Sequence, residues 1–311
     1  MSVGENSQLR AWVIATRPQT LPAGAAPVII GTAFAVHADV FAPGPAIAAL
    51  IGALLIQIGT NFANDYYDAK RGVDTDERAG FTRVTHAGLI EPEAVRRAMI
   101  ATFLLAIVLG SYLVYIGGIP IVIIGLVSIV CGIAYAGGPL PYGSYGLGDL
   151  FVFVFFGLVA TVGTYYVQAV TVVSDPFPIW LPSGSISLLA VFGGIAMGAL
   201  TTAILVVNNL RDIETDRQAG KYTLAVILGP TLTKVEYVML VLLAYVVALA
   251  VAVRLNTIIA VLPLLSVPYA ALVTRDVVIG PGGARLNQTL EATGRLLVSY
   301  SLLFAIGVIL S

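Results

Sequence analysis

The sequence is poor in charged residues. Only 11% of its 311 residues are Asp, Glu, Lys or Arg, and 58% are hydrophobic. A soluble domain carries about 25% charged residues. The mean hydropathy is +0.95. So little charge cannot cover the surface of a water-soluble globule of this length. The composition therefore excludes that class of protein and indicates a chain whose solvent is the lipid bilayer.

Cysteine is nearly absent as well. The chain has one, Cys131, inside an apolar run, so an intrachain disulfide is excluded and the thiol is interpreted as a packing residue. The first ten residues, MSVGENSQLR, lack a positive stretch followed by a short apolar core and a cleavage site. We expect no removable signal peptide, and we expect the first apolar segment to stay in the membrane.

Long apolar runs are what the sequence has instead. A helix needs about 20 mostly apolar residues to cross a bilayer. The first run contains Pro18, Pro22 and Pro27, which kink a membrane helix, and the third and fourth meet at a tight turn, Gly117-Gly118. We predict an all-α polytopic membrane protein, a single domain over residues 1–311. Its nine expected transmembrane helices cover roughly 12–36, 46–66, 95–115, 119–137, 149–173, 186–210, 235–253, 256–274 and 293–310.

The Lys and Arg residues predict the orientation. If the N-terminus is cytoplasmic, Arg254 is the only one of the 16 basic residues outside the cytoplasmic segments. Such asymmetry follows the positive-inside rule. We expect a cytoplasmic N-terminus and an external C-terminus in the cell (inner) membrane. The cytoplasmic loops cover about 67–94, 138–148 and 211–234. The external loops are short and nearly uncharged apart from residues 174–185, so chemistry is expected on the cytoplasmic face.

The second apolar segment ends in the motif NDYYDAKRGVD, residues 64–74. Asn64 and Asp68 are four residues apart and share one helix face. Gly72 is a suitable helix end, after which Asp74 can fold back towards that face. Asp65 lies about 100° round the helix from Asn64, and its role stays open.

The sixth segment ends in a related motif, NNLRDIETDRQAGKYT, residues 208–223. Asn208, Asp212 and Asp216 again follow one another at a spacing of four. Both motifs have an Asn, three residues, an Asp, a later Asp, and basic residues around a Gly. This weak internal similarity predicts two analogous helix ends that face each other.

Carboxylates on one helix face at a membrane boundary repel one another and are costly to desolvate. A Mg²⁺ ion removes that repulsion, because it prefers oxygen ligands and bridges carboxylates to phosphate oxygens. The alternative is that such residues only cap helices or solvate loops, and we favour it for Glu77, Glu91 and Glu93. The helical spacing within apolar segments favours a Mg²⁺ and diphosphate site for Asn64, Asp68, Asp212 and Asp216.

The two motifs resemble the signature regions of the UbiA superfamily of intramembrane prenyltransferases. Further matches are TRPQT at 16–20, RVTHAG at 83–88 and YAGGPLPYGSYGLGDLFVFVFFG at 135–157. These resemble the branch that prenylates 1,4-dihydroxy-2-naphthoate in menaquinone biosynthesis. The resemblance runs from Thr16 to about Gly229.

The resemblance implies a nine-helix bundle around a central cavity that the cytoplasmic loops cap. It implies that Asp68, Asp212, Asn64 and Arg83 carry the chemistry and that Asn208 contacts substrate. In many relatives the second Asp follows the first by four residues, but Gly72 occupies that position here and Asp74 lies six on. The implied ligands of Mg²⁺ and diphosphate are Asn64, Asp68, Asp74, Asp212 and Asp216.

The implied reaction joins polyprenyl diphosphate to 1,4-dihydroxy-2-naphthoate, with loss of diphosphate and CO₂, to give demethylmenaquinone. A different acceptor, such as 4-hydroxybenzoate, homogentisate, a chlorophyllide or haem, remains an alternative. A cation-coupled transporter is another, since intramembrane carboxylates and inverted repeats also occur there. No nucleic-acid partner is expected. Tail length and oligomeric state are not predicted.

Several basic residues are candidate diphosphate contacts. Cytoplasmic loops are basic in any case, so topology alone can account for many of them. Arg17 differs, because it lies within the first apolar segment, where a charge facing lipid would be costly. The candidates are Arg17, Lys70, Arg71, Arg83 and Lys221.

The stretch Gly137–Gly143 is uncharged and irregular, and such backbone at membrane depth lines a cavity or is buried in protein. Tyr135, Tyr142 and Tyr145 can wall an aromatic acceptor or stabilise an allylic cation through their rings. They can equally belong to an interfacial tyrosine belt. A similar choice, between lipid and the prenyl tail, stays open for Phe151, Phe153, Phe155 and Phe156.

Overall fold

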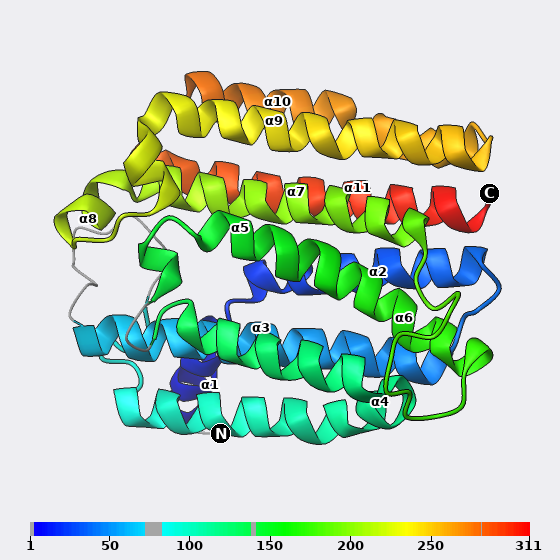
Figure 1. Ribbon diagram of the computed structural model, residues 1–311. Coiled ribbons are helices and arrows are strands. Elements are labelled where there is room, and N and C mark those ends of the chain that lie inside the picture. Colours follow the sequence, from blue (N-terminus) through cyan, green and yellow to red (C-terminus); the bar gives the residue numbers. More distant parts are fainter. Residues whose placement is uncertain (1–2, 72–82, 138–140, 281) are drawn as a thin grey trace.

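In the computed structural model, long helices run side by side between two ends (Figure 1). The structure describes residues 3–71, 83–137, 141–280 and 282–311, and every regular element among them is a helix. This confirms the predicted fold class. The elements are α1 (Val3–Thr16), η1 (Pro18–Thr20), α2 (Leu21–His37), α3 (Pro43–Arg71), α4 (Pro92–Ala134), η2 (Tyr142–Ser144), α5 (Gly148–Val152), η3 (Phe153–Val159), α6 (Ala160–Val173), α7 (Leu188–Arg211), α8 (Ile213–Gln218), α9 (Leu224–Leu255), η4 (Ile259–Ser266), α10 (Val267–Ile279), η5 (Gly283–Arg285) and α11 (Leu286–Ile309).

The first apolar segment breaks where the prolines predict a break. Arg17 has a left-handed backbone, with φ 50°, and Pro18 opens the short helix η1. The amide of Thr20 then donates to the carbonyl of Arg17 at 2.9 Å. Pro27, in contrast, lies inside α2. The break separates α1 from α2 and leaves Arg17 between them, inside the protein.

Helix α4 is a hairpin. Its 43 residues would span about 65 Å as one straight helix, which is about twice the thickness of the hydrocarbon core. Gly118 interrupts it with φ 62°, and Phe103 packs with Ile133 in one cluster. Figure 1 shows the chain returning alongside itself. The two arms match the predicted segments 95–115 and 119–137.

The described residues contain eight helical stretches that are long and apolar enough to cross a membrane, against nine predicted. The difference arises at α4, which counts as one stretch although it folds back at Gly118. The total of nine crossings stays a prediction.

The predicted loop at 211–234 is wrong in part, because much of it is helical. Helix α8 occupies Ile213–Gln218, and α9 begins at Leu224. The hydroxyl of Thr223 caps α9 by accepting from the amide of Val226 at 3.4 Å, which is favourable N-cap chemistry. Gly229, with φ 75°, then breaks α9 before its main span.

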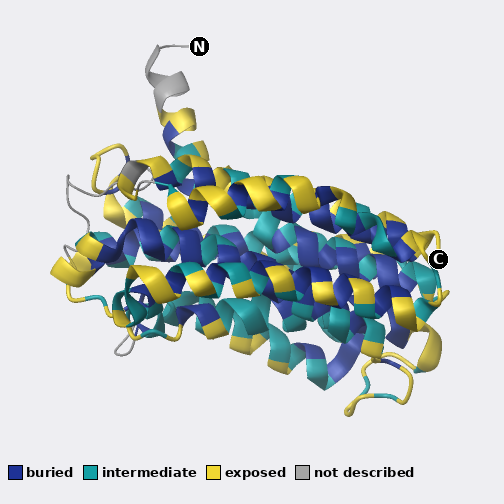
Figure 2. Cartoon of the chain, turned by 90° about the horizontal axis from the view of Figure 1, so that it is seen from above, coloured by how far each residue is buried: buried dark blue, intermediate teal, exposed yellow. Residues whose placement is uncertain are grey.

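Helix α7 lies in the buried interior of the bundle, and α4 lies on its exposed outside. In the most apolar stretch of each helix, 72% of the residues of α7 are buried but only 17% of those of α4. Figure 2 shows the same contrast between a buried interior and exposed outer faces. Helix α8 lies at one end of the bundle, and the C-terminus lies at the other (Figure 1). This placement agrees with a predicted topology in which the Asp motifs and the C-terminus are on opposite sides.

Candidate active site

A cavity of about 650 Å³ lies between α2, α3, α4, α6 and α7. It is apolar over most of its length and polar at the end near α8. The two Asp motifs both reach this polar end, although they are far apart in the sequence. The polar lining residues there include Arg17, Asn61, Asn64, Asp68, Arg83, Asn208, Asn209, Arg211, Asp212, Asp216 and Lys221.

Asp68 is paired with two of the predicted cations. Its side chain is buried, and Arg83 Nη2 donates to Oδ2 at 3.1 Å while Lys221 Nζ donates to Oδ1 at 3.3 Å. The pair with Lys221 connects the first motif to the second. The structure thus brings Asp68, Arg83 and Lys221 together, as the sequence predicts.

Asp65, whose role the sequence leaves open, anchors two guanidinium groups. Its side chain is 1% exposed. Arg17 Nη2 and Arg83 Nη1 both donate to Oδ1, the latter at 3.0 Å, and the amide of Val84 donates to Oδ2 at 3.4 Å. Asp65 is not part of the cavity wall. It holds Arg17 and Arg83 in the wall from behind.

The second motif is organised by Arg211, which sequence reasoning missed as a site residue. Arg211 Nε and Nη2 donate to the two carboxylate oxygens of Asp212, both at 2.7 Å. The same guanidinium donates to Asn208 Oδ1 and Asn287 Oδ1, each at 2.8 Å. A charge at the end of an apolar helix is the signal that could have identified Arg211. Asn287, on α11, has no such signal.

Asn208, Asp212 and Asp216, which follow one another at a spacing of four in the sequence, do not lie on one continuous helix. Helix α7 ends at Arg211, and Asp212 has φ −98° and ψ 8° between α7 and α8. The amide of Asp216 still donates to the carbonyl of Asp212 at 2.8 Å. The change of direction keeps all three side chains on the cavity wall.

A Mg²⁺ site needs several oxygen ligands close together. Over the described ranges, no three His, Cys, Asp or Glu side chains come together closely enough to hold a metal. Asp68 and Asp212 pair with cations instead. However, Asn64 Oδ1 is buried on the cavity wall and has no hydrogen-bond partner among the described residues. Asp74 lies outside the described residues.

An unpartnered buried oxygen is destabilising unless something supplies the missing contact. The oxygen of Asn64 and the nearby Asp carboxylates are the hard ligands that Mg²⁺ prefers. The residues present therefore fit such an ion.

Two predicted diphosphate contacts lie away from the cavity. Lys70 and Arg71 are exposed at the end of α3 and are not in its wall. Lys70 Nζ lies 5.9 Å from the ring centroid of Tyr66. Tyr145 is 54% exposed and also lies outside the wall.

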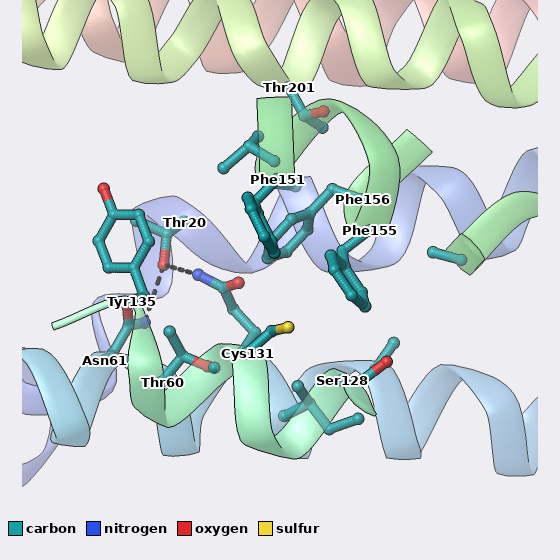
Figure 3. Close-up of a pocket in the computed structure, with 18 of the residues that line it drawn as sticks. Thr20, Thr60, Asn61, Ser128, Cys131, Tyr135, Phe151, Phe155, Phe156 and Thr201 are labelled. Carbon is teal, nitrogen blue, oxygen red and sulfur yellow. Dashed lines mark hydrogen bonds between the residues drawn. The ribbon is translucent and has the colours of Figure 1, made fainter. Parts of the chain in front are cut away.

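An aromatic wall continues from the polar end into the apolar part of the cavity. The ring centroids of Tyr135 and Tyr142 are 5.5 Å apart, and Tyr142 stacks on Phe151 at 4.1 Å. Phe151 stacks on Phe155 at 6.0 Å. Figure 3 shows Phe151, Phe155 and Phe156 on the cavity wall opposite Cys131. These contacts favour the cavity over a tyrosine belt for Tyr135 and Tyr142.

Burial raises the pKa of Tyr135 and of Tyr142 above the ordinary value, so both are neutral phenols. Phe153 differs from the other phenylalanines, because it packs against Gly198 of α7. Phe153, Phe155 and Phe156 all lie in the π-helical turn η3. Such turns are frequent at functional sites.

Comparison with protein families matches residues 25–290 to the UbiA prenyltransferase family. The chain belongs to this family. Among curated relatives, it is 38% identical to a 1,4-dihydroxy-2-naphthoate octaprenyltransferase of Mycobacterium tuberculosis, over 94% of this chain and 95% of the relative. It is 36% identical to the Escherichia coli protein of that name, over 100% of this chain and 99% of the relative.

Solved structures show the same fold. A UbiA homologue from Aeropyrum pernix K1 has a TM-score of 0.69 at 13% identity, covering 89% of this chain and 96% of that one. A homologue from Archaeoglobus fulgidus bound to GPP and Mg²⁺ has a TM-score of 0.62 at 15% identity, covering 97% of this chain and 100% of that one. The predicted resemblance to the UbiA superfamily is confirmed.

Proposed function

We propose that this chain transfers a polyprenyl group from polyprenyl diphosphate to 1,4-dihydroxy-2-naphthoate, releasing diphosphate and CO₂ and giving demethylmenaquinol, the hydroquinone form of demethylmenaquinone. The observation that carries the proposal is one cavity that joins a polar cluster of carboxylates and cations to a long apolar, aromatic-walled space. A prenyl diphosphate has the same division into a charged head and an apolar tail. The relatives described above have the acceptor in their names.

Residues of both motifs would hold Mg²⁺. When bound, the ion would neutralise charge on the diphosphate and assist its departure. The proposed ligands are Asn64, Asp68, Asp74, Asp212 and Asp216.

The cations of the cavity wall would act on the diphosphate directly. Arg17, Arg83 and Lys221 already lie at the polar end, fixed by Asp65 and Asp68. Donors held in place beforehand stabilise the negative charge that develops on the leaving diphosphate. Lys70 and Arg71, exposed at the end of α3, would attract the diphosphate head group at the membrane surface rather than line its site.

The acceptor would lie against the aromatic wall. The electron-rich ring carbon that carries the carboxylate attacks the first carbon of the prenyl group, and loss of CO₂ restores aromaticity. The neutral rings of Tyr135 and Tyr142 present their π faces to developing positive charge without adding a competing anion. The apolar wall excludes water, which would otherwise convert the allylic group to an alcohol.

We infer that the enzyme lies in the cell (inner) membrane with its N-terminus cytoplasmic, its C-terminus outside and its polar cavity end at the cytoplasmic face. The basis is the charge asymmetry of the sequence and the position of α8 opposite the C-terminus.

An assay of the purified protein tests the proposal. It combines octaprenyl diphosphate with 1,4-dihydroxy-2-naphthoate, with and without Mg²⁺, and measures prenylated product, diphosphate and CO₂. We expect one diphosphate and one CO₂ for each prenylated product, and no turnover after chelation. Parallel reactions offer 4-hydroxybenzoate and homogentisate. Faster turnover of either would overturn the naphthoate assignment, and the absence of any diphosphate release would overturn prenyl transfer itself.

A further inference from the structure

Gln57 is a buried amide on the cavity wall, beyond both Asp motifs. It lies on α3 one turn before Asn61, on the face that also carries Asn64 and Asp68, and it is 7% exposed. From the helix rise, it is about 10 Å deeper in the membrane than Asn64. This depth is beyond the expected diphosphate position and alongside the aromatic wall.

Hydrogen bonds determine the orientation of the Gln57 amide. The hydroxyl of Thr20 donates to the carbonyl of Arg17 at 2.9 Å, so its oxygen acts as an acceptor towards other groups. It accepts from Gln57 Nε2 and from Asn61 Nδ2, both at 3.0 Å (Figure 3). Asn61 Nδ2 also donates to the carbonyl of Thr16 at 2.9 Å. Flipping the Gln57 amide would set two acceptor oxygens against each other.

The fixed orientation leaves the carbonyl oxygen of Gln57 unsatisfied. Gln57 Oε1 is buried and has no hydrogen-bond partner in the part of the chain that the structure describes. An amide oxygen buried in this way lowers stability unless a ligand or water donates to it. Because Gln57 lines the cavity, a molecule bound there can supply the missing hydrogen-bond donor.

The proposed substrates differ in the donors they offer. An ionised diphosphate has only acceptors, and a prenyl tail has neither donors nor acceptors. The dihydroxynaphthoate carries two ring hydroxyls, and its flat ring suits the wall of Phe151, Phe155 and Phe156 (Figure 3). A hydroxyl donor is the chemistry that satisfies an amide oxygen.

We infer that Gln57 Oε1 accepts a hydrogen bond from a ring hydroxyl of the aromatic acceptor and so selects hydroxylated rings. This inference rests on the proposed function. Gln57 is a binding and specificity residue that touches the acceptor. Thr20 and Asn61 are positioning residues, because they hold its amide. A site built to pair a hydroxyl discriminates strongly against the ring that lacks it.

The test compares inhibition constants of naphthoates that differ by one hydroxyl. The probes are 2-naphthoate, 1-hydroxy-2-naphthoate and 4-hydroxy-2-naphthoate, each competing with 1,4-dihydroxy-2-naphthoate for octaprenyl transfer. The proteins are the wild type, Gln57→Leu, Gln57→Met and the control Gln168→Leu. Gln168 is also a buried amide, but it lies outside the cavity wall and is bonded to Thr164 and Thr32.

In the wild type and in Gln168→Leu, at least one of the two hydroxynaphthoates should have an inhibition constant about tenfold lower than that of 2-naphthoate. In both Gln57 variants that gain should fall to less than about twofold, while the KM for octaprenyl diphosphate stays unchanged. Two variants are included so that the test survives if one does not fold.

Two results would overturn the inference while leaving the proposed function standing. One is a hydroxyl gain that persists in the Gln57 variants. The other is a wild type that binds both hydroxynaphthoates no more tightly than 2-naphthoate. That result would mean that a water molecule, and not the acceptor, donates to Gln57 Oε1. A wild type that does not prenylate the dihydroxynaphthoate at all would overturn the proposed function and the inference with it.

Discussion

Lys221 Nζ lies 3.3 Å from Asp68 Oδ1, across 153 residues of sequence. The two side chains are 15% and 6% exposed, so the pair is shielded from solvent. It joins the end of α3 to the turn between α8 and α9 at the polar end of the cavity. A cation from the second motif thus faces a carboxylate of the first, which is the arrangement that a diphosphate bridging both motifs requires.

Substitution of the motif carboxylates should abolish turnover. We expect Asp68→Asn and Asp212→Asn each to lower kcat by at least about a hundredfold, because removing one preorganised electrostatic group commonly lowers kcat by about 100-fold to 1,000-fold. Diphosphate release in detergent measures it. Glu93→Gln is the matched control, since Glu93 is exposed and pairs with Arg96, which is itself exposed. Activity within tenfold of wild type in Asp68→Asn would contradict the assignment.

Asp65→Asn should weaken both folding and diphosphate binding. Asp65 holds Arg17 and Arg83 while almost fully buried, and breaking a buried pair from one side costs about 3–5 kcal/mol. We expect a lower thermal midpoint in detergent and a raised KM for octaprenyl diphosphate. The KM for the naphthoate should change little.

The control for Asp65 is Asp175→Asn in the exposed loop after α6. An Asp65→Asn protein that melts and binds like the wild type would show that the two arginines do not depend on this carboxylate.

Gly118→Ala should destabilise the α4 hairpin. Gly118 has φ 62°, and an added Cβ would lie 1.9 Å from the carbonyl oxygen of Pro178. Backbone cannot move aside as a flexible side chain does, so we expect poor accumulation and a clear fall in the melting temperature. Gly110→Ala is the control, because its Cβ would meet nothing within 4 Å. Equal melting temperatures for the two variants would contradict a tight turn at Gly118.

The pH dependence of the reaction should not report on Tyr135 or Tyr142. Burial raises both pKa values above the ordinary value, which is about 10, so neither phenol ionises below about pH 10. The neutral form is the one the fold favours. The contribution of the neutral Tyr135 and Tyr142 to the free energy of unfolding is therefore fully present below the pKa of the unfolded state. It is lost as pH rises through the pKa of the folded state.

Tyr142→Phe should accordingly keep the alkaline limb of the wild-type pH–rate profile between about pH 7 and 9. Initial rates of diphosphate release across this range provide the measurement. A variant whose alkaline limb disappears would mean that the Tyr142 phenolate forms in that range and inhibits the enzyme.

The sequence predicts the relative positions of site residues that lie on the same helix. Asn64 and Asp68 share a face because they are four residues apart, and the structure places both on the cavity wall. The spacing of four does not predict the change of direction after α7. Asp212 lies between α7 and α8, and the backbone turn there depends on packing that periodicity does not encode. Asp74 lies outside the described residues, so its place in the site stays a prediction.

The sequence by itself determined that this is a helical membrane protein with two Asp-rich helix ends, because apolar length and helical spacing are local properties. Only the tertiary structure decided which groups surround those carboxylates, as with Arg211, which pairs with Asp212 and donates to Asn287, and which oxygens stay unsatisfied, as with Gln57. The physical reason is that a buried polar atom is satisfied by neighbours across the bundle. Those neighbours come from distant segments, and their identity depends on how whole helices pack.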